Sequence, residues 1–334
     1  MRGFFPMKIL AQNPNSYLSP HSTESSRLGN QAVSVSLADL AKIPHGIVLF
    51  GIADDTGIKN VNGRVGAAAA PGAVRVKLYK QNLHTSSTPI YDLGDLLPAE
   101  SIQETHAQAQ KIIVAIHHGG HFPIILGGGH DLVAPEALAF LETHSQSPLA
   151  FLNLDAHLDL RDTSKNITSG SPWYIVSQSE SFQRQKAELV EFGIQAQSNS
   201  DVLVNFAKKN KIKIHWLPEL RKKSLLKIFS QELLRLAKKK QILVSIDIDG
   251  VRAAEAPGCS APQVQGFSAD EILEMARQAG TCKAVKSFGI YELSPPLDPS
   301  GVTTALVTQC IVQFLMGYAE RQAKGKFGKA SRLG

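Results

Sequence analysis

The sequence has few cysteines and no paired-cysteine motif. Its 334 residues include only Cys259, Cys282 and Cys310, which are widely spaced and form no C-x-x-C. This pattern gives no disulfide framework, no thiolate zinc site and no redox motif, and it fits a reducing compartment. We therefore expect a cytoplasmic protein.

Long apolar runs are also missing. No stretch reaches the roughly 20 apolar residues that a membrane span needs. The start, Met1–Pro6, has one basic residue but is followed by no sustained apolar core and no small-residue cleavage site. The sequence thus predicts neither a membrane span nor a signal peptide, and Met1–Pro6 is interpreted as a frayed beginning.

A basic patch of the kind that binds nucleic acid is absent from most of the chain. The formal net charge is +6 and the pI is about 9.1. Residues 320–334 hold five Lys/Arg against Glu320, a local +4, which leaves +2 for the remainder. No interleaving of aromatic and basic residues occurs, so we expect a solvated surface and no nucleic-acid partner.

Strand-like and helix-like segments alternate along the chain, which is 43% hydrophobic and long enough to bury a sizeable core. Strands are expected at 45–52, 91–95, 122–126, 149–155, 212–217, 242–248 and 285–291, and helices at 36–42, from 68, and at 101–118, 133–144, 180–192, 199–209, 225–239, 268–279 and 301–319. This alternation, with near-continuous apolar strands, predicts an α/β fold in which a mostly parallel sheet is covered on both faces.

Composition divides the chain into three parts. Residues 1–44 are rich in Ser, Asn and Pro and predict an irregular N-terminal arm, 45–319 a single α/β domain, and 320–334 a basic, disordered tail. Residues 54–67 form a long turn-rich loop after a strand, a place where sites often lie in parallel α/β folds, although it could be a mere surface excursion.

Two strand-like runs carry acidic residues at alternate positions. In a β-strand Asp155, His157 and Asp159 would point one way, and Asp247 and Asp249 would also point together. Carboxylates beside apolar neighbours are costly unless positive charge compensates them. A metal ion is the simplest compensation.

A further histidine follows a third expected strand. Gly127-Gly128-Gly129 precede His130, but the loop lacks the Gly-Lys-Ser/Thr ending of a phosphate-binding loop. Alone, His130 would more often be a structural histidine. At the carboxyl end of a strand in this sheet it becomes a ligand candidate.

Together the candidates supply two imidazoles and four carboxylates: His130, Asp155, His157, Asp159, Asp247 and Asp249. So many anions suit two ions about 3.5–4 Å apart better than one. Oxygen-rich ligation without thiolate favours Mn²⁺ over a closed zinc site.

The three motifs, G-G-G-H-D, D-A-H-L-D and S-I-D-I-D, occur in an order that closely resembles the binuclear manganese motifs of the ureohydrolase superfamily, which includes arginase, agmatinase and formimidoylglutamase. The resemblance runs from about Ile47 to Gly317 and also covers residues 62–67 and 291–292. It implies an arginase-like three-layer α/β/α fold, two Mn²⁺ per chain, a small-molecule substrate and a homotrimer or homohexamer.

The resemblance also implies residue roles. Asp155 and Asp247 would bridge the ions, His130 and Asp159 would complete one site, and His157 and Asp249 would complete the other. Asp159 would be the catalytic proton carrier, and Glu292 would pair with the planar amidinium of the substrate.

Departures from the superfamily pattern favour formimidoylglutamase. Arginases and agmatinases continue S-x-D-x-D with x-x-D-P, whereas Arg252 and Ala253 stand here, and no histidine lies between His157 and His215 to act as the proton relay of arginases. The segments Leu160-Arg161, 169–173 and 256–262 resemble formimidoylglutamases.

The resemblance therefore implies hydrolysis of N-formimidoyl-L-glutamate to L-glutamate and formamide, a step of histidine degradation. Arg161 and Arg252 could hold the substrate carboxylates, or could each belong to a structural ion pair. Two alternatives stay open: a ureohydrolase that releases urea from another guanidino compound, and a metal-free binding or scaffolding relative.

Overall fold

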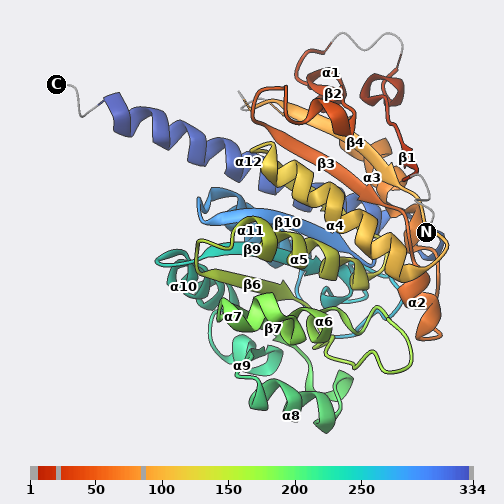
Figure 1. Cartoon of the computed structure of the whole chain (residues 1–334), viewed down its shortest axis with the longest axis vertical. Coiled ribbons are helices and arrows are strands. Elements are labelled where there is room, and N and C mark those ends of the chain that lie inside the picture. Colours follow the sequence, from red (N-terminus) through yellow and green to blue (C-terminus); the bar gives the residue numbers. More distant parts are fainter. Residues whose placement is uncertain (1–6, 20–23, 84–87, 331–334) are drawn as a thin grey trace.

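One mostly parallel β-sheet runs through the structure, which is a computed structural model that describes residues 7–19, 24–83 and 88–330, without the side chains of 323–330 (Figure 1). Its strands are β1 (Ile9–Leu10), β2 (Ala32–Ser34), β3 (Ile47–Ile52), β4 (Ile90–Leu96), β5 (Phe122–Leu126), β6 (Leu149–Leu154), β7 (Glu188–Ile194), β8 (Lys213–Trp216), β9 (Gln241–Asp247) and β10 (Val285–Tyr291). The strand order is β1-β4-β3-β5-β10-β9-β6-β7-β8, with β2 also paired to β4. Among these strands β1 alone runs antiparallel to its neighbour.

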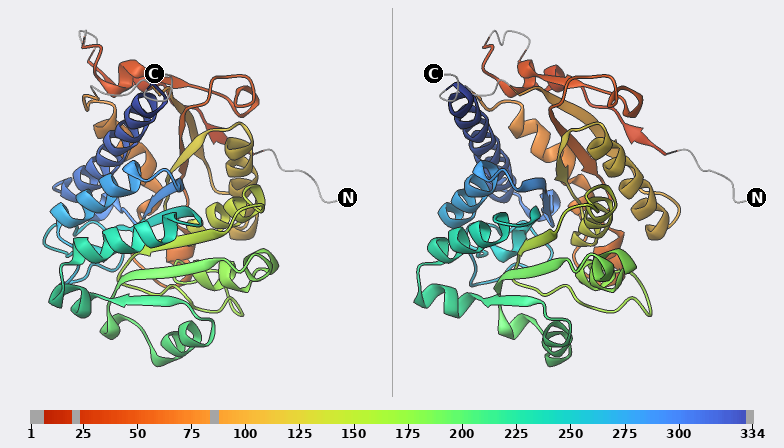
Figure 2. Two further views of the ribbon diagram at one scale, coloured as in Figure 1. Left: turned by 90° about the vertical axis from the view of Figure 1, so that its left-hand side faces the viewer. Right: turned by 60° about the vertical axis from the view of Figure 1, so that its left-hand side comes forward.

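Helices cover both faces of the sheet. They are α1 (Leu28–Gln31), α2 (Thr56–Asn60), α3 (Ala70–Leu78), α4 (Ile102–His118), α5 (Val133–Thr143), α6 (Pro172–Gln178), α7 (Glu180–Arg184), α8 (Asp201–Lys209), α9 (Leu217–Lys222), α10 (Leu225–Ala237), α11 (Ala269–Thr281) and α12 (Val302–Ala330). One apolar core joins the sheet to α3, α10, α11 and α12, and a second joins it to α4, α5 and α6 (Figure 2). The predicted three-layer α/β/α fold is confirmed.

The central strands are buried on both faces, which explains their continuous apolar sequences. Every residue of β3, β5 and β6 is buried. Because β5, β10, β9 and β6 are parallel neighbours, their carboxyl ends meet along one edge of the sheet. The loops that follow these strands are therefore brought together.

The last helix is longer than expected. By length and composition α12 could cross a membrane between Val302 and Gln322, but 72% of that window is buried inside the fold, as in a core helix. Helix α12 continues to Ala330, so the expected end of the helix at residue 319 is wrong. The tail that we expected to be disordered is helical up to Ala330. The Arg321 guanidinium lies 3.6 Å from the centroid of the Tyr318 ring and donates to the Cys282 carbonyl at 2.9 Å. These contacts fix the turn beyond residue 319. Residues 331–334 lie outside the described residues.

A strand replaces part of a predicted helix. The helix expected at 180–192 is wrong beyond Arg184, because Glu188–Ile194 form β7 between β6 and β8. Glu191, in the middle of this strand, is buried and accepts a hydrogen bond from Asn153 on β6 at 2.9 Å. Helix α6 lies in a stretch for which we expected no regular structure.

The N-terminal arm is less irregular than expected. Strand β1 pairs with the end of β4, and β2 pairs with its beginning, so both extend the sheet at one edge. The helix expected at 36–42 is a 3₁₀ turn, Leu37–Asp39, closed by a capping box between Ser36 and Asp39. Met1–Pro6 lie outside the described residues.

A buried ion network attaches α3 to β4. The guanidinium of Arg75 binds Asp92 through Nε and Nη2 at 2.8 and 2.9 Å, and it also pairs with Asp95. The Tyr79 hydroxyl donates to Asp92. Because all of these side chains are buried, the network holds fixed the helix that follows the loop after β3.

We predict that Arg75→Met lowers the free energy of unfolding by about 3–5 kcal/mol, since it leaves two buried carboxylates without their cation. Denaturant unfolding measures this loss. The matched control is Arg184→Met, which removes an exposed pair with Glu180 and should change the free energy of unfolding by less than about 1 kcal/mol. Equal effects of the two variants would contradict the assigned role of the network.

Candidate metal centre and pocket

All six predicted ligands lie where parallel strands end. His130 follows β5, residues 155–159 follow β6, and Asp247 ends β9 with Asp249 in the 3₁₀ turn after it. Our reason for the convergence is partly wrong: β6 ends at Leu154, so Asp155, His157 and Asp159 lie in a loop and not on one strand face. They meet Asp247 and Asp249 because β6 and β9 are adjacent and parallel.

A first group of ligand atoms surrounds His130. Its Nδ1 lies 2.8 Å from Asp159 Oδ2, 3.1 Å from Asp247 Oδ2 and 3.2 Å from Asp155 Oδ2. All four side chains are buried. One nitrogen therefore faces three carboxylate oxygens within the reach of a single ion.

A second group shares Asp155 with the first. His157 Nδ1 lies 3.1 Å from Asp249 Oδ2 and 3.5 Å from Asp155 Oδ1. The two groups are thus joined by the two oxygens of Asp155. Asp247 belongs to the first group by distance, and its Oδ1 accepts from the backbone N–H of Asp249 at 2.8 Å.

The electrostatics of these groups call for added positive charge. Burial, and then the neighbouring Asp249 and Asp155, raise the pKa of Asp247 well above its ordinary value. Burial likewise is the main cause that raises the pKa of Asp249 to about 7. Burial lowers the pKa of His157, but Asp249 and Asp155 outweigh it and raise the pKa to about 12. The shifted pKa values mean that protons on the aspartates and on His157 neutralise part of the negative charge of these groups. Bound divalent cations could neutralise it instead.

One buried acceptor tests whether a cation fits. Asp249 Oδ1 is shielded from solvent and has no hydrogen-bond partner within the described part of the chain. Buried carboxylate oxygens are normally paired or bind metal. The donor set, two imidazole nitrogens with four carboxylates, is also suited to hard or borderline divalent ions.

Neighbouring side chains orient the ligands. Ser245 Oγ lies 3.0 Å from His130 Nε2, which leaves Nδ1 facing the carboxylates. The backbone N–H of His130 donates to Glu292 Oε1 at 2.9 Å. Glu292 is thereby held beside the first group without being one of its members.

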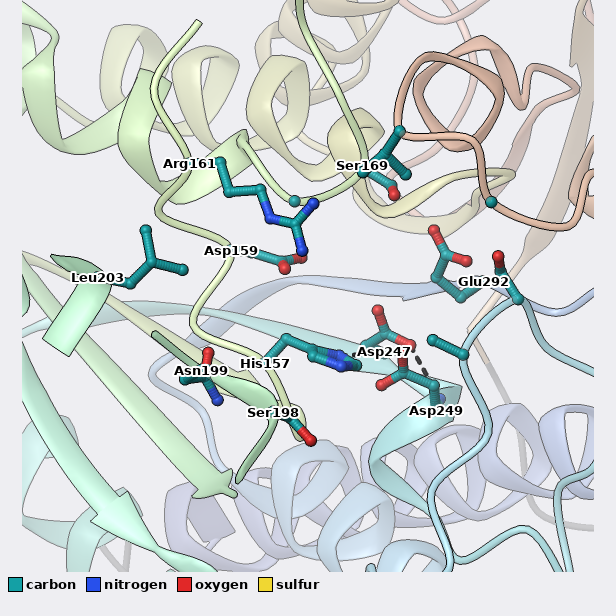
Figure 3. Close-up of a pocket in the computed structure, with 15 residues that line it drawn as sticks. His157, Asp159, Arg161, Ser169, Ser198, Asn199, Leu203, Asp247, Asp249 and Glu292 are labelled. Atoms are coloured by element: carbon teal, nitrogen blue, oxygen red, sulfur yellow. Dashed lines mark hydrogen bonds and ion pairs between the residues drawn. The ribbon is translucent and has the colours of Figure 1, made fainter. Parts of the chain in front are cut away.

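The backbone is strained at two of the predicted catalytic residues. Asp159 and Glu292 have φ angles of +49° and +66°, in the left-handed region that favours glycine. Such conformations persist where surrounding structure enforces them, and they cluster at active sites. Here they turn both carboxylates toward the pocket (Figure 3).

The glycine run before His130 serves close packing. A Cβ at Gly128 would lie 1.9 Å from the carbonyl oxygen of Asp54, and one at Gly127 would lie 2.0 Å from the Tyr291 ring. The loop after β5 therefore packs directly against Asp54 and Tyr291. The glycines make this close approach possible, and it places His130 among the candidate metal ligands.

A cavity of about 180 Å³ opens over the ligands. His157, Asp159, Asp247, Asp249 and Glu292 line it together with Arg161 (Figure 3). The Arg161 side chain has no hydrogen-bond or salt-bridge partner among the described residues, and Figure 3 shows its guanidinium above Asp159, pointing into the cavity. A cation is thus available to a ligand in the cavity.

Arg252 is not brought to this cavity. Its side chain is 44% exposed and pairs with Glu255, and it does not line the pocket. Arg252 instead pairs with Glu255, three residues further along the chain. Its predicted role in substrate binding is therefore not supported. The structural ion pair was the alternative for this residue.

Four lining residues were missed by the sequence analysis, namely Val61, Ser198, Asn199 and Leu203, whereas Ser169 and Ser260 lie in the segments 169–173 and 256–262 that carried the resemblance. Ser198 and Asn199 follow β7, and they were missed because that strand was predicted as helix. Asn199 supports the ligand loop, since its Oδ1 accepts from the Leu158 N–H at 2.8 Å. A correct strand assignment would have placed both residues at the carboxyl edge.

Comparison with known proteins agrees with this arrangement. The chain matches the Arginase family over residues 45–317. It is 30% identical over 265 residues to the formimidoylglutamase of Bacillus subtilis, covering 75% of this chain and 82% of that relative. The formimidoylglutamase of Aeromonas salmonicida is 28% identical over 273 residues, covering 80% of this chain and 86% of the relative.

Among solved structures, the fold is similar to that of Trypanosoma cruzi formiminoglutamase with Mn2+2. The TM-score is 0.77 at 26% sequence identity, and the match covers 85% of this chain and 98% of the other. The family match spans the strands and loops that carry all six candidate ligands. The chain therefore belongs to the arginase family.

Proposed function

We propose that this chain is a binuclear manganese hydrolase that cleaves a C–N bond of N-formimidoyl-L-glutamate, giving L-glutamate and formamide. The observation that carries the proposal is the pair of ligand groups sharing Asp155 beneath a cavity that also holds a free guanidinium and a buried glutamate. Formimidoylglutamases among its relatives, one solved with Mn2+2, support both the reaction and the metal.

The proposed ligands divide as the two groups do. His130 and Asp159 would hold one ion and His157 and Asp249 the other, with Asp155 and Asp247 shared. When bound, two such cations lower the pKa of a shared water and polarise the substrate. Asp155 suits a bridging role because its two oxygens already face different histidines.

Asp159 and Glu292 would carry out the proton and substrate steps. Attack of water on the amidine carbon gives a tetrahedral carbon, and the C–N bond to the glutamate nitrogen then breaks. That nitrogen must gain a proton, and Asp159, lining the cavity, would take this proton from the attacking water and pass it on. Glu292, held by the His130 N–H, would accept hydrogen bonds from the planar amidinium.

Arg161 would bind a carboxylate of the substrate. Its guanidinium, which pairs with no other described side chain, points into the cavity and matches the fork geometry that carboxylates accept. Ser169 and Ser198 add hydroxyl groups to the lining of the cavity. An anionic amino-acid derivative suits this lining.

The remaining proposals concern assembly and location. We propose that this chain, like other members of its family, assembles into a homotrimer or homohexamer. In each copy, residues 45–319 would form the catalytic unit. Cys259, Cys282 and Cys310 are unpaired, which supports the proposed cytoplasmic location. The expected lack of nucleic-acid and membrane partners stays a prediction.

The substrate test uses purified protein loaded with manganese. We expect release of formamide from N-formimidoyl-L-glutamate, about two metal ions per chain by elemental analysis, and loss of both metal and activity after chelation. Metal-free protein is the control. Release of urea from arginine or another guanidino compound, without formamide, would reassign the chain to another ureohydrolase activity, and absence of bound metal would favour a scaffolding role.

Glu292→Gln should lower kcat/KM by about 10- to 100-fold, because a neutral amide cannot form the charged hydrogen bonds with the amidinium. Metal content should stay at the wild-type value, since Glu292 belongs to neither ligand group. Steady-state kinetics and elemental analysis measure the two quantities. Unchanged kinetics would remove Glu292 from the substrate site.

Arg161→Ala should raise KM about 10- to 100-fold with little change in kcat, because it removes a contact made equally in the bound substrate and the transition state. Arg252→Ala is the matched control and should leave KM unchanged, since Arg252 does not line the pocket. A larger effect of the Arg252 variant would show that the structure assigns the wrong arginine.

A further inference from the structure

Three polar side chains lie behind the ligand groups in an otherwise apolar part of the sheet. Asn153, Glu191 and Ser245 are fully buried and belong to β6, β7 and β9. The strand register places Asn153 directly opposite both Glu191 and Ser245. Burying polar groups on central strands costs free energy unless they form hydrogen bonds.

The amide of Asn153 is held between two carboxyl groups. Its Nδ2 donates to Asp155 Oδ2 at 3.2 Å and to Glu191 Oε2 at 2.9 Å. Both N–H bonds of the amide are therefore used. Glu191 fixes the orientation of Asn153, and Asn153 in turn contacts a ligand.

Asp155 receives support on both of its oxygens. The backbone N–H of His157 donates to Oδ1 at 2.7 Å, while Asn153 donates to Oδ2. Asp155 is also the one residue common to the two ligand groups. A rotation of its carboxylate would disturb both groups at once.

We infer that Asn153, anchored by Glu191, is a positioning residue that holds Asp155 in the orientation needed to bind two metal ions. The inference rests on the proposed metal pair and concerns how the chain prepares that pair. Residues that orient metal ligands commonly contribute 10- to 100-fold to metal affinity.

Ser245 provides an internal contrast. Its hydroxyl contacts His130, which belongs to the first ligand group alone. Loss of this contact should affect one metal site, whereas loss of the Asn153 contact should affect two. General damage to the sheet would not separate the variants in this way.

The experiment titrates metal-free full-length protein with MnCl₂ by isothermal titration calorimetry. Asn153→Leu should weaken both binding events by about 10- to 100-fold, and Ser245→Ala should weaken mainly one. Glu191→Leu, which leaves Asn153 without its anchor, should also weaken both events. Thermal unfolding of each metal-free variant, followed by circular dichroism, should show a folded protein.

Glu191→Gln is the conservative control. Burial raises the pKa of Glu191 well above its ordinary value, and glutamine keeps an acceptor for the Asn153 amide, so both affinities should match those of the wild type. Should Asn153→Leu not fold, Glu191→Leu and Glu191→Gln carry the comparison.

Wild-type affinities in folded Asn153→Leu or Glu191→Leu would overturn the inference while leaving the proposed function intact. Weakening of both events by Ser245→Ala to the same extent would also overturn it, since the effect would then not pass through Asp155. A wild-type chain that binds no manganese would overturn the proposed function and this inference together.

Discussion

Concentration of negative charge at one edge of the sheet is the constraint on which the rest of the structure depends. Asp155, Asp159, Asp247 and Asp249 are buried together, and each lies at or just beyond the end of a central strand. The apolar cores on both faces of the sheet leave these carboxylates only the cavity side from which water can reach them. The arrangement is stable only with positive charge, supplied by the two histidines or by bound cations.

This constraint accounts for unusual features around the centre. Asp159 and Glu292 adopt left-handed backbone conformations, and the glycines before His130 permit backbone contacts that a Cβ would prevent. Ser245 and Asn153 occupy strand positions that apolar residues would otherwise fill. Each feature places or orients a ligand, so local stability is reduced where the chemistry requires a fixed geometry.

The sequence was sufficient for the fold class, and it singled out the six side chains that the structure groups as candidate metal ligands, because continuous apolar strands and acidic residues near their ends are local patterns. It was insufficient where tertiary contacts overrode local preference. The segment of β7 was predicted as helix, whereas in the structure it pairs with β6 and β8, and its Glu191 is buried beside Asn153. Ser198 and Asn199, which follow that strand, were missed for the same reason. Likewise, β1 and β2 are too short to predict without β4 beside them.

The two arginines show why substrate specificity is harder to predict than the metal centre. Arg161 and Arg252 each follow an acidic motif by two or three residues, so sequence position made both of them candidates, Arg161 ahead of Arg252. In the structure Glu255 pairs with Arg252 at the surface, while Arg161 keeps a free guanidinium above Asp159. The difference arises from loop conformation after β6 and β9 and not from the strands. The candidate metal ligands lie at or just beyond the ends of central strands, whereas the candidate substrate-binding groups depend on loops that a single sequence constrains weakly.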